Sequence, residues 1–260
     1  MKKILYSMLI FLLILLNFST VCADDVDNEV DFEDTIEVTA SNVSELPKTN
    51  SRRYIVYDRI SKSMIIGKNE DIKSAMASTT KIMTTIVILE KADLNETVTV
   101  SAKAGGTGGS RLGLKRGDKA SVRDLLYGLM LRSGNDAAVA LAEHVGGSVK
   151  EFAELMNEKA SELGLTNTHF VTPHGLDDAN HYTTALELAK LTDYAMNNET
   201  FSKIVGTKSI TIYINNQPRQ INNTNELLGV LNGVVGVKTG FTNNAGRCLV
   251  TETKRNNMDI

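Results

Sequence analysis

Ser78 and Lys81 are of the types, and at the spacing, that allow nucleophilic chemistry. They open the segment ASTTKIMTTIVILE (residues 77–90), whose apolar residues cover most of a helix circumference and predict a buried helix. Burial and the positive end of the helix dipole both disfavour an ammonium group, so we expect the pKa of Lys81 to lie below its usual value of about 10.4. The spacing of three residues brings such an amine to the serine hydroxyl, which it can activate without a histidine.

The Ser-x-x-Lys pattern is short, and about one copy is expected by chance in a chain of this length. Two structural interpretations therefore stand beside the catalytic one. Ser78 could cap the helix, and Lys81 could extend its amine to solvent along the helix surface. The choice between them depends on the rest of the chain.

Two further triplets carry groups suited to substrate binding and proton transfer. Ser133-Gly134-Asn135 ends one apolar helix and begins another, which places a hydroxyl and an amide on a tight connection. Lys238-Thr239-Gly240 stands at the end of an apolar strand. Its lysine offers a cation to an anionic chain end, and its glycine lets a substrate backbone approach the strand edge. Because each triplet is expected in only about one such chain in twenty, all three motifs together favour a catalytic site.

The elements that must position these groups can be assigned from periodicity and turn signals. Residues 54–58 and 63–67 flank a polar connection and predict two antiparallel strands. Strand-like runs return at 232–240 and 247–253, on either side of a turn at 241–246. Between these regions, capping boxes predict three helix starts, at Ser121-x-x-Asp124, Ser148-x-x-Glu151 and Thr184-x-x-Glu187. This order predicts an α+β fold, in which an antiparallel sheet packs against helices and carries a helical subdomain.

The sequence resembles the serine-type D-alanyl-D-alanine carboxypeptidases, the low-molecular-mass penicillin-binding proteins. The resemblance runs from about Arg52 to the end of the chain. It includes MASTTKIMT, GDKASVRDLLYGLMLRSGNDAAVALAEH, NTHFVTPHGLDD and VVGVKTGFTNNAGRCLVTET. The family combines Ser-x-x-Lys, a serine triplet and Lys-Thr-Gly in the order found here. The resemblance implies a β-lactamase/transpeptidase-like fold.

The resemblance also implies a role for each matching residue. Ser78 would be the acyl-forming nucleophile, Lys81 its base and Ser133 a proton relay. The other implied roles concern substrate binding: Asn135 would bind a peptide carbonyl, Lys238 and Thr239 the terminal carboxylate, with Gly240 at the strand edge, and the backbone N–H groups of Ser78 and Phe241 would form the oxyanion hole.

The implied reaction is removal of the terminal D-alanine from peptidoglycan stem pentapeptides through an acyl-serine, without metal or cofactor. β-Lactams would be covalent inhibitors that react with the same serine. The formal net charge of −3 argues against general affinity for nucleic acid. The implied location is the extracytoplasmic cell envelope.

Three other functions remain open. The nearest is a serine β-lactamase, although the sequence lacks Glu-x-x-Leu-Asn and has Gly134 where that class carries aspartate. A zinc-dependent wall peptidase would need ligands such as His169, His174 and His181, but no His-Glu-x-x-His occurs. The third is a non-catalytic wall-binding module. The glycines of residues 104–113 lack the Gly-Lys-Ser/Thr of a phosphate cradle and favour a flexible surface loop.

The N-terminal residues predict export. Residues 1–23 combine a basic start, an apolar run and a small residue before an acidic stretch, which is typical of a signal peptide cleaved after Ala23. An uncleaved membrane anchor and a lipoprotein signal at Cys22 are less favoured, because the apolar run is short and the residues before the cysteine fit poorly. After cleavage, Cys248 alone would remain, which excludes an intramolecular disulfide.

Residues 24–50 are acidic and aperiodic, and they predict a solvated linker before a catalytic domain at residues 51–260. The chain stops at NNMDI, where the family continues with another sheet strand, a closing helix and commonly a further β-rich domain. By this resemblance the catalytic domain is incomplete at its C-terminus. Membrane attachment through an amphipathic segment beyond residue 260 is a further implication of the resemblance.

Overall fold

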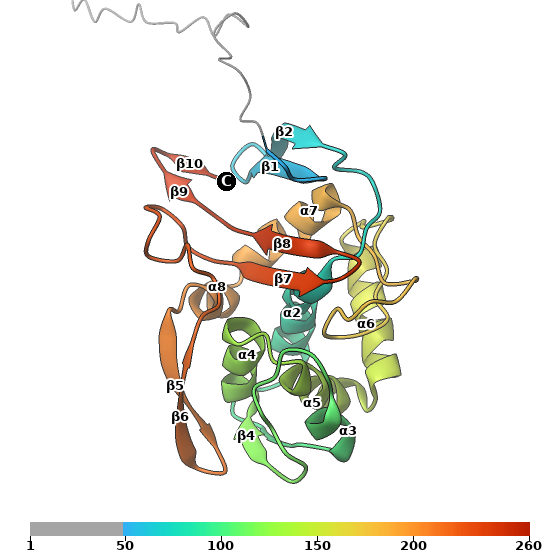
Figure 1. Cartoon of the computed structure of the whole chain (residues 1–260), viewed down its shortest axis with the longest axis vertical. Helices are drawn as coiled ribbons and strands as arrows, with labels where there is room; N and C mark the ends of the chain where they lie inside the picture. Colours follow the sequence, from blue (N-terminus) through green and yellow to red (C-terminus); the bar gives the residue numbers. More distant parts are fainter. Residues whose placement is uncertain (1–48) are drawn as a thin grey trace, which may run out of the picture. The chain divides into compact units, whose positions relative to one another are not determined.

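The computed structural model describes residues 49–260, of which Asn50–Ile260 form one compact unit. The strands are β1 (Tyr54–Asp58), β2 (Ser63–Lys68), β3 (Thr97–Thr99), β4 (Lys119–Ser121), β5 (Ser209–Ile214), β6 (Gln217–Asn222), β7 (Lys238–Thr242), β8 (Gly246–Val250), β9 (Lys254–Arg255) and β10 (Met258–Asp259). The helices are the 3₁₀ turn η2 (Ala77–Thr80), α2 (Lys81–Lys91), α3 (Ala102–Gly106), α4 (Val122–Leu131), α5 (Asn135–Gly146), α6 (Val149–Glu162), α7 (Ala185–Met196) and α8 (Glu199–Val205) (Figure 1).

The three predicted helix starts are confirmed. Ser121, Ser148 and Thr184 each accept a hydrogen bond from the backbone N–H three residues later, at the starts of α4, α6 and α7. Such a cap satisfies one of the N–H groups that a helix leaves without an intrahelical partner. Local chemistry thus sets where these helices begin.

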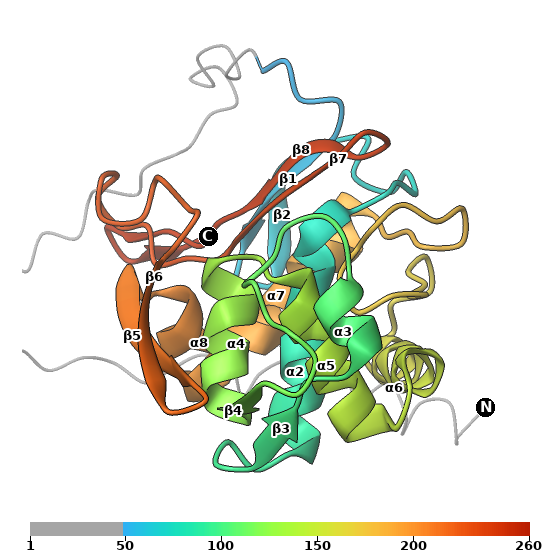
Figure 2. The same ribbon diagram turned by 60° about the horizontal axis from the view of Figure 1, so that its bottom comes forward.

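Helix α2 lies in the core of the described unit. Every residue from Lys81 to Ile88 is buried, which confirms the predicted burial on nearly all sides. The helix packs against α4, α5, α6, α7 and α8, while the η2 turn that precedes it packs against β7 and β8 (Figures 1 and 2). The N-terminal end of α2 therefore lies where the helices meet the β7–β8 hairpin.

The strands confirm the α+β class but differ from the expected sheet in one respect. The β1–β2 pair and the β7–β8 pair are both antiparallel, as predicted. The described strands form separate two-stranded ladders rather than one continuous sheet. Residues of β1, β8 and α7 line a common cavity of about 520 Å³. Among residues 49–260, no backbone ladder joins the β1–β2 hairpin to the β7–β8 hairpin.

The Lys-Thr-Gly triplet begins β7, whereas the sequence pattern placed it at the end of a strand. Residues 232–237, predicted as strand, lie before β7 and outside the named strands, although the N–H groups of Val235 and Val237 donate to the Glu252 and Val250 oxygens, both at 3.0 Å. The carbonyl of Gly236 in this loop accepts hydrogen bonds from Asn225 Nδ2 at 3.0 Å and Thr251 Oγ1 at 2.8 Å. Side chains thus bind this carbonyl, beside the backbone bonds that the segment makes to residues 250–254.

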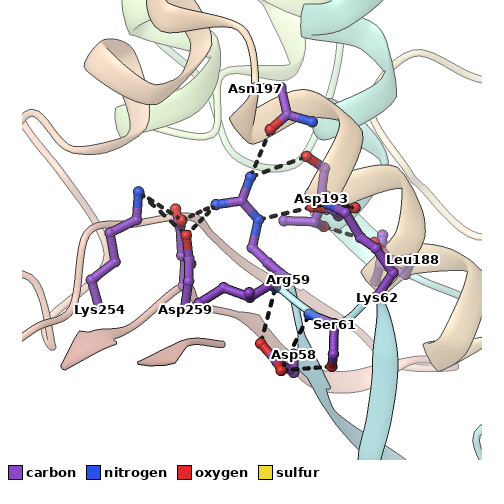
Figure 3. A network of polar contacts seen from close by, with 12 residues as sticks. Asp58, Arg59, Ser61, Lys62, Leu188, Asp193, Asn197, Lys254 and Asp259 are labelled. Carbon is purple, nitrogen blue, oxygen red and sulfur yellow. Dashed lines mark hydrogen bonds and ion pairs between the residues drawn. The ribbon is translucent and has the colours of Figure 1, made fainter. Parts of the chain in front are cut away.

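Arg59, directly after β1, joins distant parts of the chain. Its guanidinium donates to Asp193 Oδ1 in α7 at 3.0 Å, to Asn197 Oδ1 at 3.1 Å and to Asp259 Oδ2 in β10 at 2.9 Å (Figure 3). It also pairs with the buried Glu252. The network ties the end of β1 to α7 and to the last strands of the chain.

The predicted signal peptide (residues 1–23) and the predicted linker up to residue 48 lie outside the described residues. Within residues 49–260, none of the helices combines the length and the apolar character that crossing a bilayer requires. Cys248 is a free thiol.

Candidate active site

Ser78 lies in the η2 turn, directly before α2. No side chain caps either η2 or α2, so the interpretation of Ser78 as a helix cap is wrong. The preceding residue, Ala77, has a φ of +48°, a left-handed conformation that is uncommon outside glycine. Two glycines allow close packing here, because a Cβ at Gly175 would lie 1.8 Å from the Ala77 oxygen and one at Gly240 would lie 3.0 Å from the Ser78 nitrogen.

Lys81 is fully buried, so its interpretation as a solvent-exposed side chain is also wrong. Its Nζ lies 2.9 Å from Ser78 Oγ, 2.8 Å from Asn135 Oδ1 and 2.8 Å from the backbone oxygen of His174. Amide and carbonyl oxygens only accept hydrogen bonds. A neutral amine that donates its two protons to Asn135 and His174 therefore directs its lone pair at the Ser78 hydroxyl. In this state the arrangement can transfer the hydroxyl proton to the amine.

The surroundings of Lys81 favour this neutral state. Burial lowers the pKa of Lys81 well below its usual value, and the nearby Lys238 cation lowers it further. The Asp136 carboxylate acts in the opposite direction, but it is the smallest of the three effects. The sequence-based expectation of a lowered pKa thus agrees with the structure, although the main cause is burial by elements far away in the chain.

Ser133 lies on the short connection between α4 and α5, and Asn135 is the first residue of α5, as expected for a triplet that ends one helix and begins another. Ser133 is buried and has a φ of +58°, and its hydroxyl makes no hydrogen bond to any residue of the described part of the chain. Asn135 is held at both ends, because its Oδ1 accepts from Lys81 and its Nδ2 donates to the Gly108 oxygen at 2.8 Å. The amide group has a second N–H, which can donate to a substrate carbonyl.

The third motif, Lys238-Thr239-Gly240, begins β7, which packs against the η2 turn. Lys238 is buried, and burial lowers its pKa to about 7. Its Nζ donates to the Thr239 oxygen at 2.8 Å, and the Thr239 hydroxyl lies 3.0 Å from that of Thr224. The resulting cation and hydroxyl groups can bind a carboxylate. Thr224 was not predicted, because nothing in its local pattern marks it as a contact of Thr239.

Phe241 follows this triplet in β7 and is exposed. Among the described residues β7 pairs only with β8, so its other edge has no strand partner. A substrate in extended conformation can add to such an edge through backbone hydrogen bonds. The predicted oxyanion-hole residues, Ser78 and Phe241, lie on elements that pack against each other.

Asp136 is a residue of the site that sequence reasoning missed. Its buried carboxylate accepts backbone N–H groups from Leu112 at 2.8 Å, Gly113 at 2.7 Å and Leu114 at 2.9 Å. This attaches the predicted glycine-rich surface loop to the start of α5, next to Asn135. The only local signal was an acidic residue in the first turn of a helix.

The three histidines considered as zinc ligands have other surroundings. The Nδ1 of His169 lies 2.6 Å from the Asn180 oxygen, and that of His181 accepts a backbone N–H from Val171 at 2.9 Å. Burial lowers the pKa of His174 to about 3 and that of His181 to about 4, so both rings are neutral at physiological pH. Residues 49–260 contain no group of three or more His, Cys, Asp or Glu side chains that could hold a metal ion.

With this geometry established, comparison with known proteins identifies the family. The sequence matches the family model described as D-alanyl-D-alanine carboxypeptidase over residues 39–260. The chain belongs to the D-alanyl-D-alanine carboxypeptidase family. The match begins within the segment predicted as a linker, outside the described residues, so the 24–50 boundary stays a prediction.

Curated and solved members of this carboxypeptidase family resemble the chain closely. The carboxypeptidase DacF of Bacillus subtilis (strain 168) is 38% identical over 210 residues, which cover 78% of this chain and 54% of DacF. The carboxypeptidase DacC of Escherichia coli (strain K12) is also 38% identical, over 85% of this chain and 58% of DacC. The crystal structure of the Streptomyces K15 DD-transpeptidase has a TM-score of 0.78 at 35% identity, covering 83% of this chain and 89% of that one. The chain thus spans little more than half the length of these two carboxypeptidases.

Proposed function

We propose that this protein is a serine-type D-alanyl-D-alanine carboxypeptidase that removes the terminal D-alanine from peptidoglycan stem pentapeptides. The observation that carries the proposal is the 2.9 Å contact between Lys81 Nζ and Ser78 Oγ, with two oxygens that only accept hydrogen bonds beside the same amine. Family membership supports the same reaction.

In the acylation step, the Ser78 oxygen forms a bond to the carbonyl carbon of the penultimate D-alanine, and Lys81 takes the hydroxyl proton. The backbone N–H groups of Ser78 and Phe241 stabilise the negative charge that develops on the carbonyl oxygen. The C–N bond then breaks, and the proton passes from Lys81 by way of Ser133 to the leaving D-alanine nitrogen. Water subsequently attacks the ester carbonyl and gives one proton to Lys81. The bond between the carbonyl carbon and the Ser78 oxygen then breaks, and Lys81 returns the proton to that oxygen, which releases the shortened peptide and restores the serine.

Binding of the peptide involves three contacts in this proposal. The cationic form of Lys238 and the hydroxyl of Thr239 bind the terminal carboxylate. The second amide N–H of Asn135 donates to a backbone carbonyl of the peptide. The peptide backbone adds to the free edge of β7, where Gly240 leaves room for it.

Mass spectrometry after treatment with penicillin tests the nucleophile. We expect one covalent adduct, mapped to Ser78, in the wild type and in the control variant Ser202→Ala, and none in Ser78→Ala. An adduct on another residue of the folded protein contradicts the proposal. Persistence of the adduct distinguishes a carboxypeptidase from a β-lactamase, which hydrolyses it rapidly. Loss of D-alanine release on metal chelation would instead favour a zinc enzyme.

Transfer of the acyl group to an amine is the second candidate reaction, because the solved Streptomyces K15 relative is described as a DD-transpeptidase. Both reactions share the acyl-enzyme and differ only in the acceptor that releases the peptide. A pentapeptide assay with and without added glycine separates them. We expect the tetrapeptide as the main product in both cases, whereas a glycine-extended peptide would indicate transfer.

We also propose that the protein acts in the cell envelope after export, with a signal peptide at residues 1–23 and a catalytic domain that begins at residue 51. Family membership supports this location. N-terminal sequencing of the exported protein should begin at Asp24. Membrane attachment through a segment beyond residue 260 belongs to the same proposal, and sedimentation of the native protein with membranes tests it.

A further inference from the structure

A chain of hydrogen bonds leads from the buried His181 to the peptide group between Ala77 and Ser78. The N–H of Val171 donates to His181 Nδ1 at 2.9 Å, so this ring nitrogen carries no proton. In the neutral ring the proton is then on Nε2, which lies 2.8 Å from Thr80 Oγ1 and donates to it. The Thr80 hydroxyl in turn donates to the Ala77 oxygen at 2.8 Å. The proton positions are therefore fixed along the series: His181 donates to Thr80, and Thr80 donates to the Ala77 oxygen.

The surrounding residues hold His181, Thr80 and the Ala77 carbonyl in these positions. His181 is only 3% exposed, and the ring of Phe170 contacts it edge-on. Gly175 packs so closely against the Ala77 oxygen that a Cβ there would overlap it. The Ala77 carbonyl is therefore held from two sides, by a hydroxyl donor and by a neighbouring backbone.

The hydrogen bond to the Ala77 oxygen affects Ser78 because a peptide group is rigid. The Ala77 carbonyl and the Ser78 N–H belong to one planar unit, so fixing the oxygen also fixes the direction of the N–H. The left-handed φ of Ala77, +48°, is unfavourable for alanine and needs such support. A hydrogen bond to the carbonyl also polarises the peptide and strengthens its N–H as a donor.

We propose that His181 and Thr80 are positioning residues that aim the Ser78 N–H at the oxyanion of the acylation step. The inference rests on the proposed acyl-transfer function. Neither side chain is proposed to touch the substrate. Both act through the Ala77–Ser78 peptide, from behind the η2 turn.

The adjacent Thr79 provides a matched control. Thr79 is equally buried, and its hydroxyl donates to the Met76 oxygen at 2.5 Å. This bond is of the same kind as the Thr80 bond but supports the previous peptide group, whose N–H belongs to Ala77. Thr79→Val and Thr80→Val therefore remove similar hydroxyls, and only the second one acts on the Ser78 N–H.

The experiment compares kcat, KM and the affinity for a peptide boronic acid, which forms a tetrahedral adduct with the serine. Removal of an oxyanion donor costs about 10²–10³ in rate, so misdirecting one by Thr80→Val should lower kcat about tenfold. We expect KM to stay nearly constant, boronate affinity to fall by the same factor, and Thr80→Ser to restore both. Thr79→Val should change neither by more than about twofold, a margin set by the usual scatter of single interactions.

Variants of His181, which begins the series of hydrogen bonds, keep the inference testable if Thr80→Val does not fold. His181→Gln retains an N–H that can reach Thr80, whereas His181→Phe retains the ring shape without any donor. We expect kcat to fall more in His181→Phe than in His181→Gln at equal KM. Equal effects of Thr79→Val and Thr80→Val, or of the two His181 variants, would overturn the inference and leave the proposed function intact. Absence of Ser78 acylation in the wild type would overturn both.

Discussion

Lys81 and Lys238 are two buried lysines with different surroundings, and the difference suits different tasks. Burial lowers the pKa of both, but Lys81 also has Lys238 as a neighbouring cation and falls well below its usual value, whereas Lys238 falls only to about 7. The lowered pKa of Lys81 favours its neutral form, while near neutral pH a substantial fraction of Lys238 remains charged. A neutral amine serves as a base, and a buried cation binds a carboxylate.

Lys238→Arg tests this division through the pH dependence of kcat/KM. The charged form of Lys238 predominates below a pH of about 7 and is lost above it, so we expect kcat/KM of the wild type to fall on the alkaline side from about pH 7. A guanidinium stays charged throughout, because its pKa exceeds about 12. The variant should therefore lose the alkaline decline, even if its maximum is lower.

We also expect kcat/KM to fall on the acidic side, because protonation of Lys81 removes the base, and this acidic decline should remain in Lys238→Arg. The exposed Lys119→Arg serves as the control and should reproduce the wild-type profile. An alkaline decline that is unchanged in Lys238→Arg would assign that decline to another group.

At the scale of elements, two long-range links hold the loops around the site. The Asp136 carboxylate attaches Leu112, Gly113 and Leu114 to the start of α5 through their backbone N–H groups. Ordering a surface loop rich in glycine costs conformational entropy, which these hydrogen bonds help to offset. The ordered loop supplies the Gly108 oxygen that holds the Asn135 amide.

Replacing Asp136 by alanine should release this loop. Three N–H groups lose their acceptor, two of them buried and that of Gly113 partly buried, so we expect the free energy of unfolding to fall by about 3 kcal/mol. Limited digestion with trypsin should then cleave after Arg111, Lys115 or Arg116 more rapidly than in the wild type, in which we expect the anchored loop to slow cleavage. Asp118→Ala is the control, because its carboxylate accepts from Lys115 N at the end of the loop and from the Asn215 side chain outside it, and from none of residues 112–114. Equal digestion of the two variants would show that Asp136 does not anchor the loop.

A second link joins the β7–β8 hairpin to the loop after His174. Asp177 accepts a hydrogen bond from Thr242 Oγ1 at 2.6 Å and from Asn244 N at 3.3 Å. We expect Asp177→Ala and Thr242→Val each to lower the rate of penicillin acylation about fivefold, the equivalent of one hydrogen bond of about 1 kcal/mol.

Because both changes remove the bond between Asp177 and Thr242, the rate loss in the double variant should be smaller than the product of the two single losses. The neighbouring Asp178, whose side chain binds only Asn180 N in its own loop, provides the control variant Asp178→Ala. Additive losses in the double variant would show that the two residues act separately.

At the scale of the whole described unit, the Arg59 network links residues that are distant in sequence. The Arg59 side chain is 10% exposed and its partner Glu252 is 1% exposed, so the pair is largely shielded from water. Burial, together with the neighbouring Asp259, raises the pKa of Glu252. A buried carboxylate such as that of Glu252 destabilises the folded protein when its cationic partner is removed.

Arg59→Ala should therefore destabilise the protein by about 3 kcal/mol, the cost of leaving one member of a buried pair alone. The matched control is Lys62→Ala. Lys62 also pairs with Asp193, but its side chain is 54% exposed, and we expect a loss below about 1 kcal/mol. Urea denaturation measures both. Since Arg59 lies outside the candidate site, acylation of the folded variant should match the wild type, and similar stability of the two variants would contradict this account.

Much of the local structure could be predicted from the sequence because its causes are local. The helix starts at Ser121, Ser148 and Thr184 follow from side chains that bind the backbone three residues later. Burial of α2 follows from its apolar periodicity. The proximity of Ser78 and Lys81 follows from their spacing on a helical turn, whether α or 3₁₀.

Other features depend on partners far away in the chain, and no local pattern encodes them. The His174 oxygen reaches Lys81, Asp136 binds a loop that precedes it by more than one element, and His181 supports Thr80. The sequence predicted one sheet, because periodicity shows which face of a strand is buried but not which strand lies beside it. The pairing of β1 with β2 and of β7 with β8 was predicted from local turn signals, whereas the separation of the described strands into two-stranded ladders was decided by the fold.

The sequence by itself determined the residue types and their local spacing, namely a serine and a lysine one turn apart and two triplets able to bind a peptide. Only the tertiary structure decided that these groups meet, that Lys81 is fully shielded from water, and which oxygens occupy its two protons. The physical reason is that a lysine loses its charge through burial by other elements, and burial is a property of how those elements pack.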